Sequence, residues 1–288
     1  MKSQRDSFFD SLYEIAKRDK DVILISADMG APALDQWREN LPEQFINIGI
    51  AEANMIAVAA GLALSGKKPF CYAIMPFVTL RCYEAIKVNL CLMNLPVTLV
   101  GVGAGFSYDD SGPTHHATED ISIMRALPNL RIYNASDSTL ATHFARIGYE
   151  ETAPVYIRLD REVLPQLYQE NGQEIGDGVA LIHGGHSTLV FATGNMVSKV
   201  KSIKDVSLYD VWRLKPLNVP RILEVIQGVK QVITVEEHLL AGGLGSAIAE
   251  VFVDNGIQIP LKRIGIKDKY YYTYGGRKNI QEVAELLI

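Results

Sequence analysis

The chain has 288 residues, of which 48% are hydrophobic and 21% charged, and its formal net charge at pH 7 is -5. This length is enough for two domains that each bury a core. The acidic balance lacks the basic footprint of a nucleic-acid-binding protein, so we expect no nucleic acid partner. No apolar run reaches the length of a membrane span, and the start MKSQRDSFFD lacks a signal peptide's apolar segment. We therefore expect no membrane partner and a cytoplasmic location.

Apolar runs and amphipathic runs alternate along the first part of the chain. Strands that are apolar throughout belong in parallel sheets covered on both faces, and their alternation with helices is typical of a doubly wound α/β domain. We expect strands at 21–30, 69–73, 96–102, 131–134 and 155–159, and helices at 5–16, 80–92, 121–126 and 138–149.

Residues 161–178 are polar and irregular and are interpreted as a linker. The alternation resumes after them in STLVFATGNMV, VSLYDV, a helix at 220–226, QVITVEEH, a helix at 243–252 and LKRIGI. We expect two doubly wound α/β domains, at residues 1–165 and 176–288, of which the second is smaller.

Residues 45–66, FINIGIAEANMIAVAAGLALSG, begin as a strand, turn at Gly49 and continue as a helix of small apolar residues. Glu52 is the only charge in this stretch. One interpretation is a solvated carboxylate that complements the positive end of the helix dipole. The helix offers no polar face, however, which predicts a buried Glu52 whose pKa is raised by apolar surroundings.

The loop GVGAGFSYDDSGPTHHATED at 101–120 is rich in glycine and small polar residues, as expected of a loop that approaches a ligand. The alternative is a surface turn in which His115 and His116 cap the following helix.

Three cysteines, Cys71, Cys82 and Cys91, have neither a CxxC pair nor histidine spacing, and we expect them to be reduced and buried. His238 and the glycine-led helix that follows it are interpreted as structural.

Two segments resemble those of a known family. IGIAEANMIAVAAGLA resembles the segment of transketolases and other thiamine diphosphate enzymes that holds a glutamate opposite the cofactor's aminopyrimidine ring. DSGPTHHATEDISIMRALPNL resembles the transketolase loop and helix that carry an active-site histidine. The whole chain resembles the pyrimidine-binding and C-terminal domains of a split transketolase. The resemblance implies that Glu52 binds the ring nitrogen N1′ and favours the imino tautomer, and that His115 faces the substrate and moves protons there.

The resemblance also assigns binding residues. Arg5, Ser26 of the SAD turn and Arg161 match positions that hold the sugar phosphate, although a lone arginine is more often a solvated surface residue. Phe77 is the candidate for stacking on the pyrimidine, with a core phenylalanine as the alternative, and Asp28 is a second candidate for cofactor binding.

Two positions depart from the family. The histidine expected before the glycine loop falls in residues 101–103, Gly-Val-Gly, and the hydroxyl-reading aspartate is replaced by Ser111, with Asp110 adjacent. These departures concern the substrate and not the cofactor.

The diphosphate half of the cofactor site is missing. Gly176, Asp177 and Gly178 spell the GDG of a thiamine diphosphate motif but lie in the linker, and we assign no metal ligand to this chain. The resemblance therefore implies a partner subunit that supplies the diphosphate and Mg²⁺ ligands, in an α2β2 heterotetramer. The expected function is that of a transketolase subunit that moves a two-carbon ketol unit between sugar phosphates. The alternatives are a 1-deoxyxylulose-5-phosphate-synthase-like or 2-oxo acid dehydrogenase β-like subunit, or a non-catalytic homologue.

Overall fold

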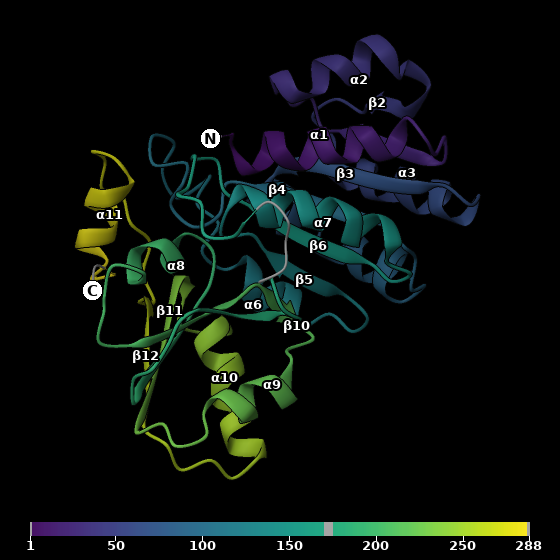
Figure 1. Ribbon diagram of the computed structural model, residues 1–288. Helices are drawn as coiled ribbons and strands as arrows, with labels where there is room; N and C mark the ends of the chain where they lie inside the picture. The colour runs from purple at the N-terminus through teal and green to yellow at the C-terminus, as the bar shows by residue number, and fades with distance from the viewer. Residues whose placement is uncertain (1, 170–174, 287–288) are drawn as a thin grey trace.

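A computed structural model describes residues 2–169 and 175–286 and contains two β-sheets (Figure 1). The first sheet has seven strands in the order β10-β5-β6-β4-β3-β1-β2, all parallel except β10, which pairs antiparallel with β5. The strands are β1 (Val22–Ser26), β2 (Phe45–Asn47), β3 (Lys68–Ile74), β4 (Thr98–Val102), β5 (Arg131–Asn134), β6 (Val155–Leu159) and β10 (Arg213–Lys215).

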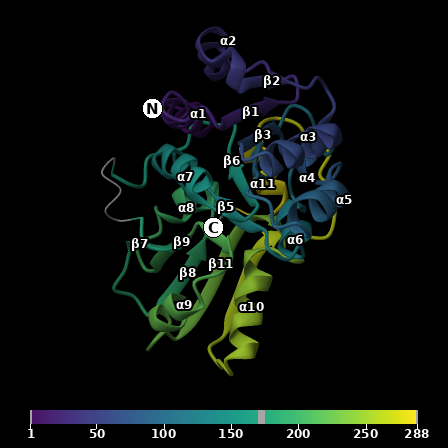
Figure 2. The same cartoon turned by 90° about the vertical axis from the view of Figure 1, so that its right-hand side faces the viewer.

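Helices cover both faces of this sheet (Figure 2). On one face α1 (Gln4–Ala16) packs against α7 (Ser138–Glu150), because α1 buries Phe8, Phe9 and Leu12. The other face is covered by α3 (Glu52–Leu64), α4 (Met75–Thr79), α5 (Tyr83–Ala85), a π-helical turn (Ile86–Cys91) and α6 (Asp120–Arg125). A short helix, α2 (Asp35–Asn40), lies beside α1.

The second sheet has five strands in the order β12-β11-β8-β9-β7, and only β7 is antiparallel to its neighbour. Helices again lie on both of its faces, with α9 and α10 on one side and α8 and α11 on the other. The elements are β7 (Val179–His183), β8 (Thr188–Ala192), α8 (Asn195–Val200), β9 (Ser207–Val211), α9 (Val219–Val225), β11 (Gln231–Leu239), α10 (Leu244–Asp254), β12 (Leu261–Ile266) and α11 (Arg277–Val283).

The two sheets are joined by more than the linker. One continuous apolar cluster contains residues from α3 and α6 together with residues from α9 and α10. In addition, β10 leaves the second half of the chain and forms the edge of the first sheet. Asp177 fixes this crossing, because its carboxylate accepts hydrogen bonds from Arg213 on β10 and from Asn218.

The expectation of doubly wound α/β architecture is confirmed. The helix expected over 80–92 is instead broken into α5 and the π-helical turn, and β7, β10, α2, α4, α8 and α11 were not predicted. All three cysteines are free and buried, as expected, and burial raises their thiol pKa values, to about 12 for Cys82 and about 11 for Cys91. Over residues 2–169 and 175–286, the structure has no helix with the length and apolar character of a membrane span.

Candidate active site

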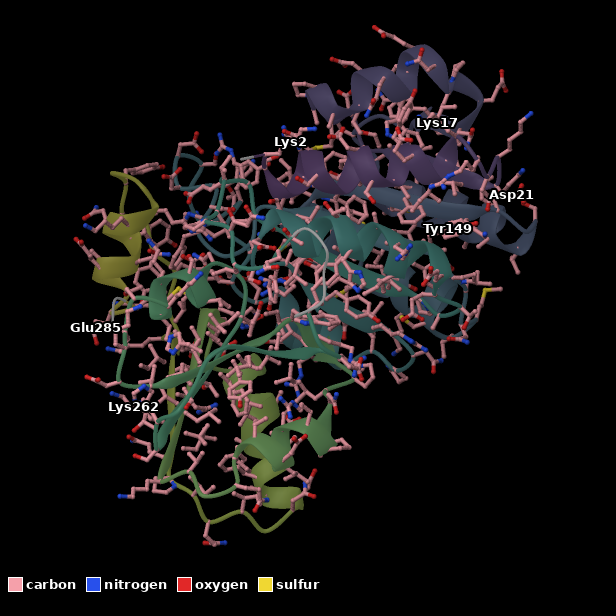
Figure 3. The ribbon with its side chains drawn as sticks, viewed as in Figure 1. Lys2, Lys17, Asp21, Tyr149, Lys262 and Glu285 are labelled. Carbon is pink, nitrogen blue, oxygen red and sulfur yellow. The ribbon has the colours of Figure 1, made fainter. Side chains whose placement is uncertain are left out.

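The candidate residues gather at one edge of the first sheet. Strands β2, β1, β3, β4 and β6 are parallel neighbours, so their carboxyl ends share an edge, which is where ligands bind in open α/β sheets. The loops that follow these strands carry the predicted residues, and the start of α1 lies at the same edge. Lys2, which precedes α1, and Asp21, which precedes β1, accordingly lie at opposite ends of this sheet (Figure 3).

Glu52 is the first residue of α3, placed there by a turn in which Gly49 has a φ of 74°. Its side chain is 3% exposed, as predicted. The expectation that its surroundings are apolar is wrong, however, because Glu52 Oε2 accepts a hydrogen bond of 2.8 Å from Nη1 of Arg81. Oε1 of Glu52 has no hydrogen-bond partner among the described residues. A buried carboxylate with one free oxygen is suited to accept a further donor.

The helix that begins at Glu52 is not buried all round, which corrects the sequence prediction. Its outward side is exposed at Ala53, Asn54, Ala57, Gly61 and Leu64. These residues are small or apolar, and Leu64 remains 62% exposed. An apolar helix face of this kind is typical of a surface that another chain covers.

Three side chains meet beside Glu52, two from the segment after β3 (Phe77 and Arg81) and one from the loop after β4 (His115). Phe77 lies on α4, after β3, and its ring packs edge-on against the ring of His115 with 5.2 Å between centroids. The guanidinium of Arg81 lies 4.8 Å from the centre of the same Phe77 ring. Phe77 is partly exposed and not a core residue. The structure thus brings Glu52, Phe77 and His115 together, with Arg81 between the first two.

The two histidines of the 101–120 loop have different surroundings. His115 is partly exposed, and its Nδ1 lies 3.0 Å from the hydroxyl of Thr114. His116 is buried against Phe106, and burial lowers its pKa. Neither histidine caps the following helix, because α6 starts at Asp120 with Glu119 as its N-cap residue. His115 is therefore the histidine of this loop that faces the candidate site.

Arg161 lies against Tyr108, a tyrosine that the sequence analysis did not single out, and the charge of Arg5 acts on the same phenol. The guanidinium of Arg161 lies 4.7 Å from the centre of the Tyr108 ring and donates to Asp110 at 3.1 Å. Arg5 donates to Asp6 at 2.8 Å. Burial raises the pKa of Tyr108, and the charges of Arg161 and Arg5 oppose that rise. Both guanidinium groups therefore act on the same phenol.

A buried network holds the two arginines in place. The backbone N–H of Asp160 donates to Gln4 at 2.7 Å, and the Gln4 side chain donates to the carbonyl of Ala135 at 3.1 Å. The Asp160 carboxylate accepts hydrogen bonds of 2.9 Å and 2.8 Å from Arg277 on α11. Because Gln4 precedes Arg5 and Asp160 precedes Arg161, one network positions both. In the sequence, this network was indicated only by the charged run RLDRE at 158–162, because Gln4 and Arg277 are far from that run along the chain.

Ser26 and Asp28 lie near the same edge but are engaged in the turn after β1. Ser26 is 1% exposed, and its hydroxyl accepts a hydrogen bond from the backbone N–H of Met29. Asp28 has a φ of 54° and exchanges hydrogen bonds with Asn47, the last residue of β2. Both residues support the turn between β1 and the segment that leads to Glu52.

The remaining polar candidates are bound into the scaffold. Asp177 of the GDG sequence is paired with Arg213, as described above. His238 is buried, accepts a hydrogen bond from the N–H of Ile121 on Nε2 and donates from Nδ1 to its neighbour's carbonyl at 2.8 Å. Burial lowers its pKa to about 4. Within residues 2–169 and 175–286, no group of three or more His, Cys, Asp or Glu residues is arranged to hold a metal ion.

Comparisons with known proteins agree with this arrangement. The family described as "Transketolase, pyrimidine binding domain" matches residues 2–166, and "Transketolase, C-terminal domain" matches residues 177–283. One of the subunits of an apulose-4-phosphate transketolase of Actinobacillus succinogenes is 32% identical over 92% of this chain and 88% of that protein. A 1-deoxy-D-xylulose-5-phosphate synthase of Caldanaerobacter subterraneus is 32% identical over 93% of this chain but only 44% of that protein.

A solved structure described as "Split gene transketolase, inactive beta4 tetramer" superposes with a TM-score of 0.89 and 27% identity, over 100% of this chain and 95% of the other. The relatives that match over most of their own length are thus single subunits of comparable size. The chain belongs to the transketolase family, in which it carries the pyrimidine-binding domain followed by the C-terminal domain.

Proposed function

We propose that this chain is the pyrimidine-binding subunit of a split, thiamine diphosphate-dependent transketolase that transfers a two-carbon ketol unit between sugar phosphates. The observation that carries the proposal is the meeting of Glu52, Phe77 and His115 at the carboxyl edge of the first sheet. A buried carboxylate, an aromatic ring and a histidine supply, in one place, a proton acceptor, a stacking surface and a second proton-transfer group.

The residues present fit the ring half of thiamine diphosphate. Oε1 of Glu52 is available to a protonated ring nitrogen, and the partly exposed face of Phe77 is available to a flat ring. When bound, thiamine diphosphate supplies the carbon nucleophile of the reaction. Arg81 lies over Phe77 and beside Glu52, so we expect its guanidinium to shift towards solvent when the ring binds; its side chain is already 49% exposed.

His115 and the two arginines define the substrate side. His115 lies between Phe77 and Tyr108, with 5.9 Å between its ring centroid and that of Tyr108. A histidine in this position is suited to exchange protons with substrate oxygens near neutral pH. Arg161, which lies against Tyr108, and Arg5, whose charge acts on the same phenol, suit an anionic end group such as a phosphate. The phosphorylated sugar in the name of the relative from Actinobacillus succinogenes supports the same choice.

A partner subunit completes the site in this proposal. The diphosphate and Mg²⁺ need anion-binding and oxygen-ligand groups, and Asp177 of the GDG sequence is occupied by Arg213. The exposed face of α3 starts one residue after Glu52 and continues the apolar surface of Ile50, which is 77% exposed. We assign this face to the contact with the diphosphate-binding subunit, in an α2β2 assembly.

The test is reconstitution with a diphosphate-binding transketolase subunit, followed by product analysis with a ketose phosphate or pyruvate as donor and an aldose phosphate as acceptor. Ketol transfer from the ketose phosphate is expected. Carbon dioxide release from pyruvate would favour a 1-deoxyxylulose-5-phosphate-synthase-like or 2-oxo acid dehydrogenase-like reaction. The assay with pyruvate is needed because a synthase matches 93% of this chain. Failure of the assembled complex to retain thiamine diphosphate would support a non-catalytic homologue.

A further inference from the structure

The ring of Tyr108 lies directly on the backbone of Gly103. A Cβ atom added at Gly103 would lie 2.3 Å from Cε2 and 2.4 Å from Cδ2 of Tyr108, which is far inside van der Waals contact. Gly103 also has a φ of 103°, a conformation that side-chain-bearing residues rarely adopt. The glycine after β4 is therefore what allows the tyrosine ring to occupy this position.

The position is central to the site. The Tyr108 ring lies 5.9 Å from the His115 ring on one side and 4.7 Å from the Arg161 guanidinium on the other. His115 marks the reacting end of the candidate site and Arg161 the anionic end. Any substrate that reaches from one to the other must pass the Tyr108 ring.

The phenol hydroxyl of Tyr108 remains available to a ligand. The side chain is only partly buried, and its hydroxyl makes no hydrogen bond with the residues that the structure describes. Because burial raises its pKa, the phenol is neutral at physiological pH and can donate a hydrogen bond. The Arg161 guanidinium lies 4.7 Å from the centre of this ring, and the charge of Arg5 also acts on the phenol, so an anion held by the two arginines lies near the hydroxyl.

We propose that Tyr108 is a specificity-determining residue whose hydroxyl is the third donor, with Arg5 and Arg161, to the tetrahedral oxyanion at the end of the substrate. This inference rests on the proposed function, because it names the recognition group of the same site. In this arrangement the oxyanion accepts hydrogen bonds from two guanidinium groups on long side chains and from one phenol hydroxyl on a rigid ring. The rigid ring sets the distance between the bound oxyanion and His115. The substrates selected are sugars whose anionic group lies at that distance from the reacting carbonyl.

The experiment uses the reconstituted complex with Tyr108→Phe, which keeps the ring on Gly103 and removes only the hydroxyl. KM for a phosphorylated ketose is expected to rise about 10- to 100-fold with kcat nearly unchanged, as for the loss of a hydrogen bond to a charged group. The inhibition constant of inorganic phosphate should rise by a similar factor, and KM for the nonphosphorylated ketose should stay the same. Tyr13→Phe is the matched control, because Tyr13 packs on Trp37 and Lys17 outside this site.

Two kinetic results would overturn the inference: unchanged kinetics in Tyr108→Phe, or an equal rise in KM for both ketoses, which would mean that the tyrosine only shapes the loop. Calorimetry on the same complexes measures the affinity for inorganic phosphate directly, without any reaction. This measurement separates the inference about Tyr108 from the proposed function. If the wild-type complex shows no ketol transfer but Tyr108→Phe still weakens phosphate binding, the proposed reaction is wrong and the role of Tyr108 stands. If ketol transfer occurs and phosphate binding is insensitive to the hydroxyl, Tyr108 has no such role.

Discussion

Replacement of Glu52 by glutamine separates a role in cofactor activation from a role in helix stability. Glutamine keeps the shape of the side chain and an oxygen that can accept the hydrogen bond from Arg81. It cannot carry the negative charge that favours a protonated ring nitrogen. If Glu52 activates thiamine diphosphate, proton loss from carbon C2 of the cofactor should slow by about 10²- to 10⁴-fold, the range for removal of a general acid–base group.

The effect on stability should be small, and its size follows from the ion pair. Hydrogen bonds that involve a charged group contribute about 1.5–3 kcal/mol and neutral ones about 1 kcal/mol, so the substitution costs about 1 kcal/mol of unfolding free energy. This loss is partly offset, because Glu52 is 3% exposed and a neutral amide is easier to bury than a carboxylate. Arg81 is 49% exposed and can return to water. The melting temperature should therefore fall by at most about 2–4 °C.

The assay is hydrogen–deuterium exchange at C2 of the cofactor bound to the assembled complex, with the melting temperature measured on the same sample. Glu84→Gln is the matched control, because Glu84 lies on α5 and is exposed. It should leave both quantities unchanged. An exchange rate in Glu52→Gln equal to that of the wild type would refute the role of Glu52 and leave only the interaction with the helix dipole, which contributes about 0.3–1 kcal/mol.

Three further predictions concern other parts of the chain. Without its partner the chain should bind thiamine diphosphate weakly, because Asp177 is engaged by Arg213; calorimetry that gives a micromolar, Mg²⁺-dependent affinity would contradict the split site. Arg161→Ala should raise KM for phosphorylated substrates about tenfold or more and leave nonphosphorylated ones unchanged, whereas equal losses would make Arg161 structural. Burial raises the pKa of Asp210 to about 7 in the folded protein, above its value of about 3.9 in the unfolded chain. Between about pH 4 and 7 the carboxyl is therefore protonated in the folded state and ionised in the unfolded state, so the free energy of unfolding should fall as pH rises through this range. Asp210→Asn should remove that part of the slope in urea denaturation, and identical slopes would show that the buried carboxyl does not hold the proton.

The strands of the first sheet could be predicted from the sequence because each central strand is buried on both faces. VILIS of β1 and TLVGV of β4 are fully buried, and their polar residues, Ser26 and Thr98, stand only at a strand end. Glu52 could be found for the converse reason, since one charge in an apolar helix start is conspicuous. The exposed side of α3 could not be predicted, because an exposed apolar helix face has the same composition as one that packs into a core.

The neighbours of the candidate residues could not be predicted because they arise from long side chains and backbone conformation. Arg81 reaches Glu52 across 29 positions of sequence, and nothing in its local pattern points to that contact. Tyr108 reads as an ordinary loop aromatic until the positive φ of Gly103 shows how closely the ring approaches the backbone. In both cases the missing information was the path of a loop at the edge of the sheet.

The second half of the chain supplies none of the predicted site residues, yet it determines where two of them lie. Arg277 of α11 is 5% exposed and is held between the carboxylates of Asp160 and Glu237, which belong to the first and second halves of the chain. Removal of one partner from such a buried pair costs about 3–5 kcal/mol, because the remaining charge is left without compensation. That cost opposes any separation of the two halves at this point. Since Asp160 directly precedes Arg161, we expect the proposed anion-binding end of the site to keep its shape only while the C-terminal half is docked, which is a physical reason for both domains to remain in one chain.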